Sequence, residues 1–322
     1  MPGDGPPILV TGITRSGTTW VASMLNASSE VVYVNEPLNP QHPPGRSPGV
    51  LRADVRHRFQ YICADNEAEF EGAYRDLVNL RYHLAAELRT NHRIADVGRA
   101  LRHLGMFTRG RIQDRRLMVA DPFAVFSAEW FARQMGFRVV VIVRHPLAVV
   151  SSRKRLGWRF DLDELLAQPL LLRDWLNPIE TSWPEALRHT DDVVAGGAQL
   201  WRLVYEVVSA QHQRLPDMIV VRHEDLSLDP VGEFRALYEL LGLTFDERAE
   251  QTIVQSSSSQ NPGQLDPSNP HAVQLDSRAN LESWRSRISA DDAGRILQIA
   301  GPLTDRLYPA WSLGQALPLD AP

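Results

Sequence analysis

The chain has 322 residues, 43% of them hydrophobic, and its formal net charge at neutral pH is −5. This size is enough for a large hydrophobic core, and an isoelectric point near 6.1 argues against bulk binding to nucleic acid or to anionic membranes. The single cysteine, Cys63, excludes a disulfide framework and a cysteine-based metal site.

The chain carries no obvious targeting segment. No apolar run is long enough to span a bilayer, and residues 1–7 lack the basic and apolar regions of a signal peptide. We therefore expect a cytoplasmic protein with no membrane span. Lys154 is the only lysine, so arginine must take any role that lysine usually has at an anion site.

Short apolar runs alternate with helical patterns along the chain. Strands are expected at residues 8–11, 31–34, 117–120, 138–143 and 218–221, and helices at 16–25, 126–135, 147–155 and 232–241. The run at 138–143 is apolar on both faces, as a central parallel strand would be. The alternation predicts a three-layer α/β fold of the P-loop type, with helices on both faces of a mostly parallel sheet.

No repeat or long linker divides the chain, so we expect a single domain over residues 1–322. Segments at about 37–110 and 156–190 interrupt the alternation and are expected to be insertions. The second insertion is rich in Leu and Trp and is a candidate acceptor wall or lid. A segment at about 255–280, rich in Ser, Gln, Asn and Pro, is expected to be a mobile loop.

A glycine-rich turn joins the first strand to the first helix. Residues 12–17 have the Gly-x-x-x-x-Gly spacing of a phosphate-binding loop, whose amides and helix N-terminus face an anion. ATP-binding loops continue with a lysine that bridges the β- and γ-phosphates, whereas Thr18 and Thr19 follow here. The turn is therefore expected to hold a terminal or diester-like phosphate through its amides and the hydroxyls of Ser16, Thr18 and Thr19.

The run Arg15-Ser16-Gly17-Thr18-Thr19-Trp20 resembles the 5′-phosphosulfate loop, Lys/Arg-Ser-Gly-Thr-Thr-Trp, of sulfotransferases that use 3′-phosphoadenosine-5′-phosphosulfate (PAPS). Arginine at the first position is common in the bacterial and glycan-type branch. The resemblance implies that Arg15 contacts the transferring sulfonate, that Thr18 and Thr19 bind the 5′-phosphate, and that Trp20 lies against the adenine. Because arginine stays protonated, Arg15 is expected to supply charge rather than a proton.

A second motif follows the strand at 138–143. The family's 3′-phosphate site is an arginine at a strand end and a serine eight residues further on, and Arg144 and Ser152 have this spacing. A guanidinium offers a planar fork to a phosphate dianion, and a serine on the following helix supplies a hydroxyl. The two motifs together imply a nucleotide with a 5′-phosphosulfate and a separate 3′-phosphate.

Two further segments resemble the family more loosely. Residues 222–226, Arg-His-Glu-Asp-Leu, stand where the family often has Tyr-Glu-Asp-Leu, so His223 replaces a tyrosine near the adenine. Arg278 and Arg285 resemble the segment that closes over the 3′-phosphate. The resemblance therefore adds His223, Arg278 and Arg285 to the expected nucleotide site.

Transfer of a sulfonate to an alcohol needs a base for the hydroxyl proton. The candidates are Glu36, His145, Asp121 and His223. Glu36 follows the second strand, so it should lie at the carboxyl edge of the sheet, where ligands bind in open α/β folds. The Glu36-Pro37 pair also resembles the glycan-type branch, in which a glutamate at a similar place is the proposed base. We expect Glu36 to be the base, Asp121 to have another polar role in the site, and His145 to be structural.

These features predict a PAPS-dependent O-sulfotransferase that acts by in-line transfer, needs no metal and releases adenosine 3′,5′-bisphosphate. The expected acceptor is a hydroxyl of a glycan, a glycolipid or a small-molecule alcohol, and nucleic acid is not expected as a partner. A P-loop kinase or phosphotransferase and a non-catalytic nucleotide-binding module are the alternatives. The missing lysine disfavours the first, and Arg144, Ser152 and the candidate base disfavour the second. The sequence leaves the acceptor and the oligomeric state open.

Overall fold

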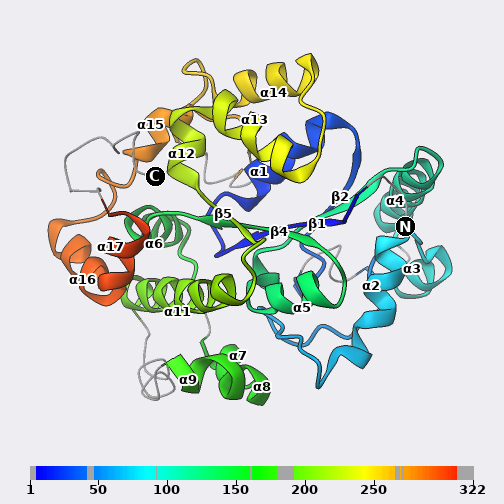
Figure 1. Ribbon diagram of the computed structural model, residues 1–322, viewed down its shortest axis with the longest axis horizontal. Coiled ribbons are helices and arrows are strands. Elements are labelled where there is room, and N and C mark those ends of the chain that lie inside the picture. The colour runs from blue at the N-terminus through cyan, green and yellow to red at the C-terminus, as the bar shows by residue number, and fades with distance from the viewer. Residues whose placement is uncertain are drawn as a thin grey trace.

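A five-stranded sheet of order β2-β3-β1-β4-β5 forms the centre of the fold (Figure 1). The computed structural model describes residues 5–41, 47–91, 93–159, 162–179, 192–264, 269 and 272–309. The strands are β1 (Ile8–Gly12), β2 (Val31–Asn35), β3 (Arg116–Ala120), β4 (Arg138–Val143) and β5 (Ile219–Arg222), and all four pairings are parallel. All five expected strands and the α/β fold class are confirmed.

The burial of the strands agrees with their order in the sheet. Every residue of β1 and β3, and all but the first residue of β4, is buried. Parallel strands need crossover connections, and their helices cover both faces of the sheet. β1 lies between β3 and β4, so the turn that follows it reaches the middle of the carboxyl edge.

Helices cover the sheet on both sides (Figure 1). One face packs against α1 (Thr18–Leu25), α13 (Pro230–Leu241) and α14 (Glu247–Ser257) in a single apolar cluster. The other face packs against α5 (Ala128–Arg133) and α11 (Val193–Arg214). This arrangement gives the three expected layers.

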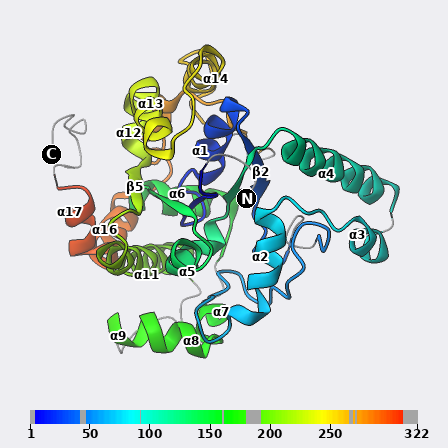
Figure 2. The ribbon, with the colours of Figure 1, turned by 45° about the vertical axis from the view of Figure 1, so that its right-hand side comes forward.

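The remaining elements surround this centre. The helices are α2 (Glu71–Val78), α3 (Leu84–Thr90), α4 (Ile94–Ile112), α6 (Pro146–Leu156), α7 (Asp163–Leu166), α8 (Pro169–Leu171), α9 (Asn177–Ile179), α12 (His223–Leu228), α15 (Ser277–Leu281), α16 (Ala290–Ala300) and α17 (Pro302–Leu307). Short 3-10 turns occupy Asn26–Ser28, Glu67–Glu69 and Pro122–Ser127, and Leu172–Leu176 is a π-helical turn. Figure 2 shows α2, α3 and α4 together on one side of the molecule.

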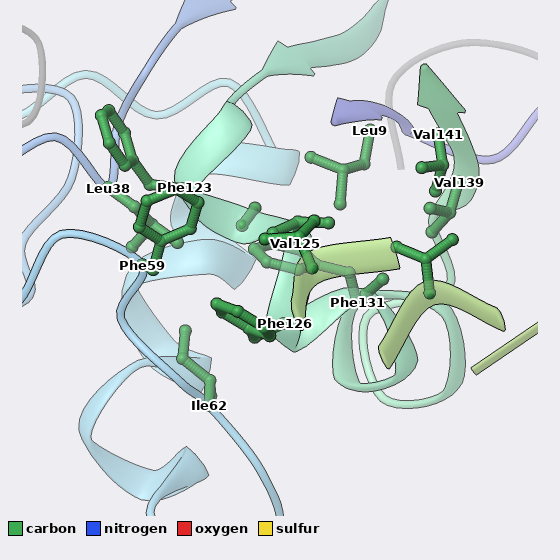
Figure 3. Close-up of a cluster of buried hydrophobic side chains, with 14 of the residues drawn as sticks. Leu9, Leu38, Phe59, Ile62, Phe123, Val125, Phe126, Phe131, Val139 and Val141 are labelled. Atoms are coloured by element: carbon green, nitrogen blue, oxygen red, sulfur yellow. The ribbon is translucent and has the colours of Figure 1, made fainter. Parts of the chain in front are cut away.

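The first expected insertion shares the main core. Phe59 packs edge-on against Phe123 and Phe126, with ring centroids 5.2 and 5.7 Å apart, and Figure 3 shows Leu38 and Ile62 beside them. The segment after β2 is therefore anchored by the residues that follow β3. A single domain over residues 1–322 stays a prediction.

Three segments differ from the expectation. α11 was not among the expected helices; it forms although its Gly196-Gly197 pair disfavours a helix, and it buries Val194 and Ala198 in an apolar cluster with Val150 of α6. The expected helix at 126–135 begins as a 3-10 turn, since Pro122 and the Asp121 cap start the segment earlier. Short helices α7 to α9 fill part of the 156–190 segment.

Parts of three expected segments lie outside the described residues. These parts are residues 42–46 and 92 of the first insertion, residues 160, 161 and 180–190 of the second insertion, and residues 265–268, 270 and 271 of the expected loop at 255–280. At its two ends that loop is helical, because α14 continues to Ser257 and α15 starts at Ser277. Within the described part of the chain, no helix combines the length and apolarity needed to cross a bilayer.

Candidate active site

A cavity of about 620 Å³ lies at the carboxyl edge of the sheet. This volume is within the range of about 300–1,000 Å³ that is common for ligand sites. The predicted site residues that line it are Arg15, Gly17, Thr18, Thr19, Trp20, Glu36, Arg144 and His223. Ser16 and Ser152 are buried next to the lining, and the cavity lining does not include Arg278 or Arg285.

The phosphate-loop turn has a backbone that glycine makes possible. Gly17 has φ 105° and Gly12 has φ 147°, both in the region that side chains rarely adopt. A Cβ atom at Gly17 would lie 2.5 Å from Cδ2 of His223. α1 then begins at Thr18 with no side-chain cap and no acidic residue in its first turn. The amides of that turn have no intrahelical acceptor, so they are available to an anion.

Hydrogen bonds join the two predicted phosphate motifs directly. The Nη1 atom of Arg144 donates to the carbonyl of Arg15 over 3.1 Å, and Nε of Arg15 donates to Oγ of Ser152 over 3.0 Å. From the same helix as Ser152, Nη1 of Arg153 donates to Oγ1 of Thr14 over 2.7 Å. Segments more than 120 residues apart in the sequence thus form one wall of the cavity.

Arg15, Arg144 and Arg153 line this part of the cavity, and Arg155 and Arg287 lie close enough for their charges to act on this group. Burial, followed by the charges of Arg144, Arg155, Arg153 and Arg287, lowers the pKa of Arg15 to about 10. Burial and the charges of Arg155 and Arg144 lower the pKa of Arg287 to about 10 as well. Burying cations without a counter-charge is unfavourable. The charge of Glu224 acts on Arg144, and the cluster as a whole favours an anion in the cavity.

Sequence reasoning missed Arg153, Arg155 and Arg287. The two arginines of α6 follow Ser152 closely, so the helical spacing offered a signal for them. The signal for Arg287 was absent, since it lies two residues beyond Arg285 in an irregular segment.

Arg278 and Arg285 lie elsewhere. Arg278 is exposed and donates to the carbonyl of Leu228 over 2.7 Å. Arg285 is exposed, pairs with Glu282 and lies over the ring of Trp284. The structure therefore does not bring either predicted residue to the cavity.

One end of the cavity has an aromatic wall. The rings of Trp20 and His223 lie 5.4 Å apart, and Phe234 packs edge-on against Trp20 at 5.3 Å. Nε1 of Trp20 donates to Oγ of Ser256 over 3.0 Å, which fixes the indole. Burial, and to a lesser extent the charge of Arg144, lowers the pKa of His223 well below its ordinary range. A neutral imidazole and an indole are suited to the faces of a heteroaromatic base.

Glu36 lies at the other end of the cavity, on a constrained turn. Its φ is 50°, its amide donates to the carbonyl of Ala120 over 2.8 Å, and its Oε2 accepts from Nδ2 of Asn39 over 2.7 Å. The carboxylate of Asp121 accepts from the amides of Leu38 and Phe123 over 2.6 and 2.8 Å. Asp121 is fully buried, and burial together with the charge of Glu36 raises its pKa well above its ordinary value. Asp121 therefore holds the turn that carries Glu36.

His145 has a structural position. Its amide donates to Oε1 of Glu224 over 2.9 Å, and its Nδ1 accepts from the amide of Leu147 at the start of α6. Glu224 also accepts a hydrogen bond from the hydroxyl of Tyr308 over 2.8 Å. Burial lowers the pKa of His145 well below its ordinary value. Of the four candidate bases, only Glu36 and His223 line the cavity.

Residues 6–247 match the protein-family model described as "Sulfotransferase family". The chain belongs to the sulfotransferase family. It is 22% identical to carbohydrate sulfotransferase 1 of Danio rerio, over 93% of this chain and 77% of that protein. It is 30% identical to carbohydrate sulfotransferase 5 of Homo sapiens, over 37% of this chain and 27% of that protein. A solved sulfotransferase domain, from the Synechococcus PCC 7002 olefin synthase, has a TM-score of 0.47 and 19% identity, covering 97% of both chains.

Family membership makes the protein a sulfotransferase enzyme rather than a phosphotransferase. Both curated relatives named above are vertebrate proteins, so the expected bacterial branch and cytoplasmic location stay predictions.

Proposed function

We propose that this sulfotransferase moves the sulfonate of PAPS to a hydroxyl group of an acceptor. The observation that carries the proposal is the direct contact between the two phosphate motifs, through the Arg15–Ser152 and Arg144–Arg15 hydrogen bonds. PAPS has two separate anionic groups, a 5′-phosphosulfate and a 3′-phosphate. A wall that joins two arginine motifs offers a partner to each of them.

The residues of the cavity fit such a nucleotide. The uncapped first turn of α1 and the hydroxyls of Thr18 and Thr19 would hold the 5′-phosphate. Arg144, Ser152 and Arg287 would hold the 3′-phosphate; Nε of Arg144 and Nη2 of Arg287 are buried donors without a hydrogen-bond partner among the described residues. The adenine would lie against Trp20 and His223, which both line the cavity.

Arg15 and Glu36 have the two chemical roles in this proposal. PAPS supplies the sulfonate, whose bond to the phosphate oxygen breaks as the acceptor oxygen bonds to sulfur. Arg15, with a pKa of about 10, stays charged at neutral pH and stabilises the negative charge on the sulfonate and the departing phosphate. Glu36 accepts the hydroxyl proton, and Asn39 orients its carboxylate through Oε2.

The acceptor would enter beside Glu36. The cavity is also lined by Asn39 and Gln41, which follow Glu36 in the chain, and by Arg58, Trp158 and Arg159; the guanidinium of Arg15 lies 5.6 Å from the ring of Trp158. Amide groups and a partly exposed indole are suited to a molecule with several hydroxyls and a flat face. These groups support a glycan, the sugar of a glycolipid or a small-molecule alcohol as acceptor.

A thermal-shift comparison tests the proposal. Adenosine 3′,5′-bisphosphate at a hundred times its dissociation constant should stabilise the protein by about 2.7 kcal/mol, and ATP with magnesium should stabilise it much less. Greater stabilisation by ATP with magnesium would contradict the proposal. Labelled PAPS with a panel of sugars and alcohols should then give a labelled product, and chelation by EDTA should not slow its formation. Bisphosphate binding without transfer to any acceptor of the panel would favour the non-catalytic alternative.

A further inference from the structure

Helix α4 (Ile94–Ile112) has two apolar faces, and only one of them is covered. On the inner face Ala100, Phe107 and Gly110 are buried, and a Cβ atom at Gly110 would collide with Val32. On the opposite side Ile94, Leu101 and Ile112 are 93%, 57% and 79% exposed. At about 100° per residue these three side chains project within about 20° of one another. They form a single stripe, which we call the outer stripe.

The space in front of the outer stripe is open among the described residues. Gly98 and Gly105 lie in the same stripe, and a Cβ atom at either glycine would meet nothing within 4 Å. Figures 1 and 2 both place α4 at the periphery of the molecule. Of the seven large hydrophobic side chains exposed in the described part of the chain, four belong to α3 and α4, namely Leu88 and the three residues of the stripe. The exposed apolar surface is therefore concentrated in one place.

Arginines border the outer stripe on both sides. Arg102 and Arg109 lie on one side, and Arg93 and Arg111 lie on the other, at helical angles of about 60–100° from the stripe. All four are exposed, and none forms an ion pair with another described residue. The one carboxylate of α4, Asp96, lies toward the inner side and pairs with Arg99 over 2.8 Å. The outer half of the helix is thus apolar at its centre and wholly cationic at its edges.

We propose that the outer face of α4 docks on an anionic lipid surface. Apolar side chains enter the boundary between headgroups and acyl chains, and flanking arginines meet the lipid phosphates with their aliphatic stems lying along the apolar layer. A second copy of the chain fits less well, because pairing two such helices would set arginine against arginine. Nucleic acid fits the arginines but gives no burial to the apolar stripe.

The net charge of −5 does not oppose this docking. Interactions between exposed charges are screened beyond about 8 Å at physiological ionic strength. A surface therefore responds to the charges that face it, and those on the outer half of α4 are all positive. The inference does not depend on the proposed sulfonate transfer.

Vesicle co-sedimentation of the full chain tests the proposal. The wild-type protein should bind phosphatidylcholine vesicles that contain about 30% phosphatidylglycerol at least tenfold more tightly than vesicles of phosphatidylcholine alone. The variant Ile94→Gln/Leu101→Gln/Ile112→Gln should lose at least tenfold in binding to the anionic vesicles. A matched control, Leu240→Gln/Val254→Gln, changes two apolar residues that are also about half exposed and should bind like the wild type.

The charges are tested separately. Arg102→Gln/Arg109→Gln/Arg111→Gln should weaken binding to anionic vesicles by about a hundredfold, while Arg56→Gln/Arg75→Gln/Arg235→Gln, which removes arginines paired with carboxylates, should have little effect. Thermal melting checks that every variant is folded. Equal binding to both vesicle types, or undiminished binding by the stripe variant, would overturn the proposal. So would a wild-type dimer in light scattering that the stripe variant abolishes.

Discussion

The two ends of the cavity are built in different ways. The nucleotide end comes from regular elements, namely the β1–α1 turn, the β4–α6 junction and α12, whose positions are fixed by a buried parallel sheet. The acceptor end comes mainly from irregular segments, around residues 35–41, Arg58 and residues 157–159. Its position is held by single contacts, such as the Asp121 carboxylate on the amide of Leu38.

This difference separates what the fold provides from what the individual protein adds. The carboxyl edge of a parallel sheet places an uncapped helix N-terminus and strand-end arginines where an anion can bind. The loops after β2 and α6 provide the residues that face the anion from the acceptor side of the cavity. Changes at the nucleotide end should therefore alter nucleotide affinity, and changes at the acceptor end should alter transfer to the acceptor without altering nucleotide affinity.

The sharpest test of that separation is Glu36→Gln. Removing the base should lower turnover by about 10²–10⁴-fold and leave the affinity for adenosine 3′,5′-bisphosphate nearly unchanged. Steady-state transfer assays and calorimetric titration measure the two quantities. Glu239→Gln, on the exposed side of α13, is the matched control. Wild-type turnover by Glu36→Gln at neutral pH would show that Glu36 is not the base.

At the nucleotide end, Arg287 and Arg285 form a natural pair for comparison. Arg287→Gln removes a cation beside Arg144 and Arg155, so bisphosphate affinity should fall by about tenfold or more. Arg285→Gln removes an exposed cation that pairs with Glu282, so affinity should not change. If Arg285→Gln lowered the bisphosphate affinity more than Arg287→Gln did, the 3′-phosphate would be bound by Arg285, the residue that the sequence indicated.

The turn itself is tested by Gly17→Ala with Gly136→Ala as control. Both glycines have positive φ, but only the Cβ atom at Gly17 has a neighbour, Cδ2 of His223 at 2.5 Å. Backbone strain of about 1–2 kcal/mol is expected in both variants, with an additional loss of unfolding free energy and of nucleotide affinity in Gly17→Ala. Urea denaturation and titration give these values. Equal stability losses and intact affinity in Gly17→Ala would contradict the tight contact.

The smallest expected effect concerns His145, which lies outside both ends. Burial lowers its pKa well below 6.5, so the folded protein keeps the ring neutral while the unfolded chain takes up a proton below pH 6.5. The unfolded state then binds more protons, and stability is lost as the pH falls. His145→Asn keeps an acceptor for the amide of Leu147 and should make this loss shallower, by up to about 1.4 kcal/mol per pH unit. Identical pH slopes from urea unfolding would contradict the burial argument.

Local patterns explain how much of this could be predicted. The five strands and the phosphate turn follow from runs of apolar residues and from glycine spacing, which act over a few residues. The position of Glu36 at the carboxyl edge could be predicted from the end of β2. The hydrogen bond from the amide of Leu38 to the carboxylate of Asp121 could not be predicted, because it joins residues 83 positions apart in the sequence.

Other features depended on packing that no local pattern carries. α11 forms in spite of two adjacent glycines, with Val194 and Ala198 buried against Val150 of α6. Arg285 and Arg287 are equivalent in the sequence, and only the path of an irregular segment decides which one approaches Arg144. The exposed stripe of α4 and its arginines were not predicted, because the net charge was summed over the whole chain and not over single faces.

The central claim is that the cavity holds a nucleotide with a separate 3′-phosphate. Calorimetric titration of the wild-type protein with adenosine 3′,5′-bisphosphate and with AMP tests this most directly, because the two ligands differ only in that group. We predict at least about a hundredfold tighter binding of the bisphosphate, the equivalent of one charge-assisted phosphate site at about 2.7 kcal/mol. Equal affinities for the two nucleotides would contradict the claim.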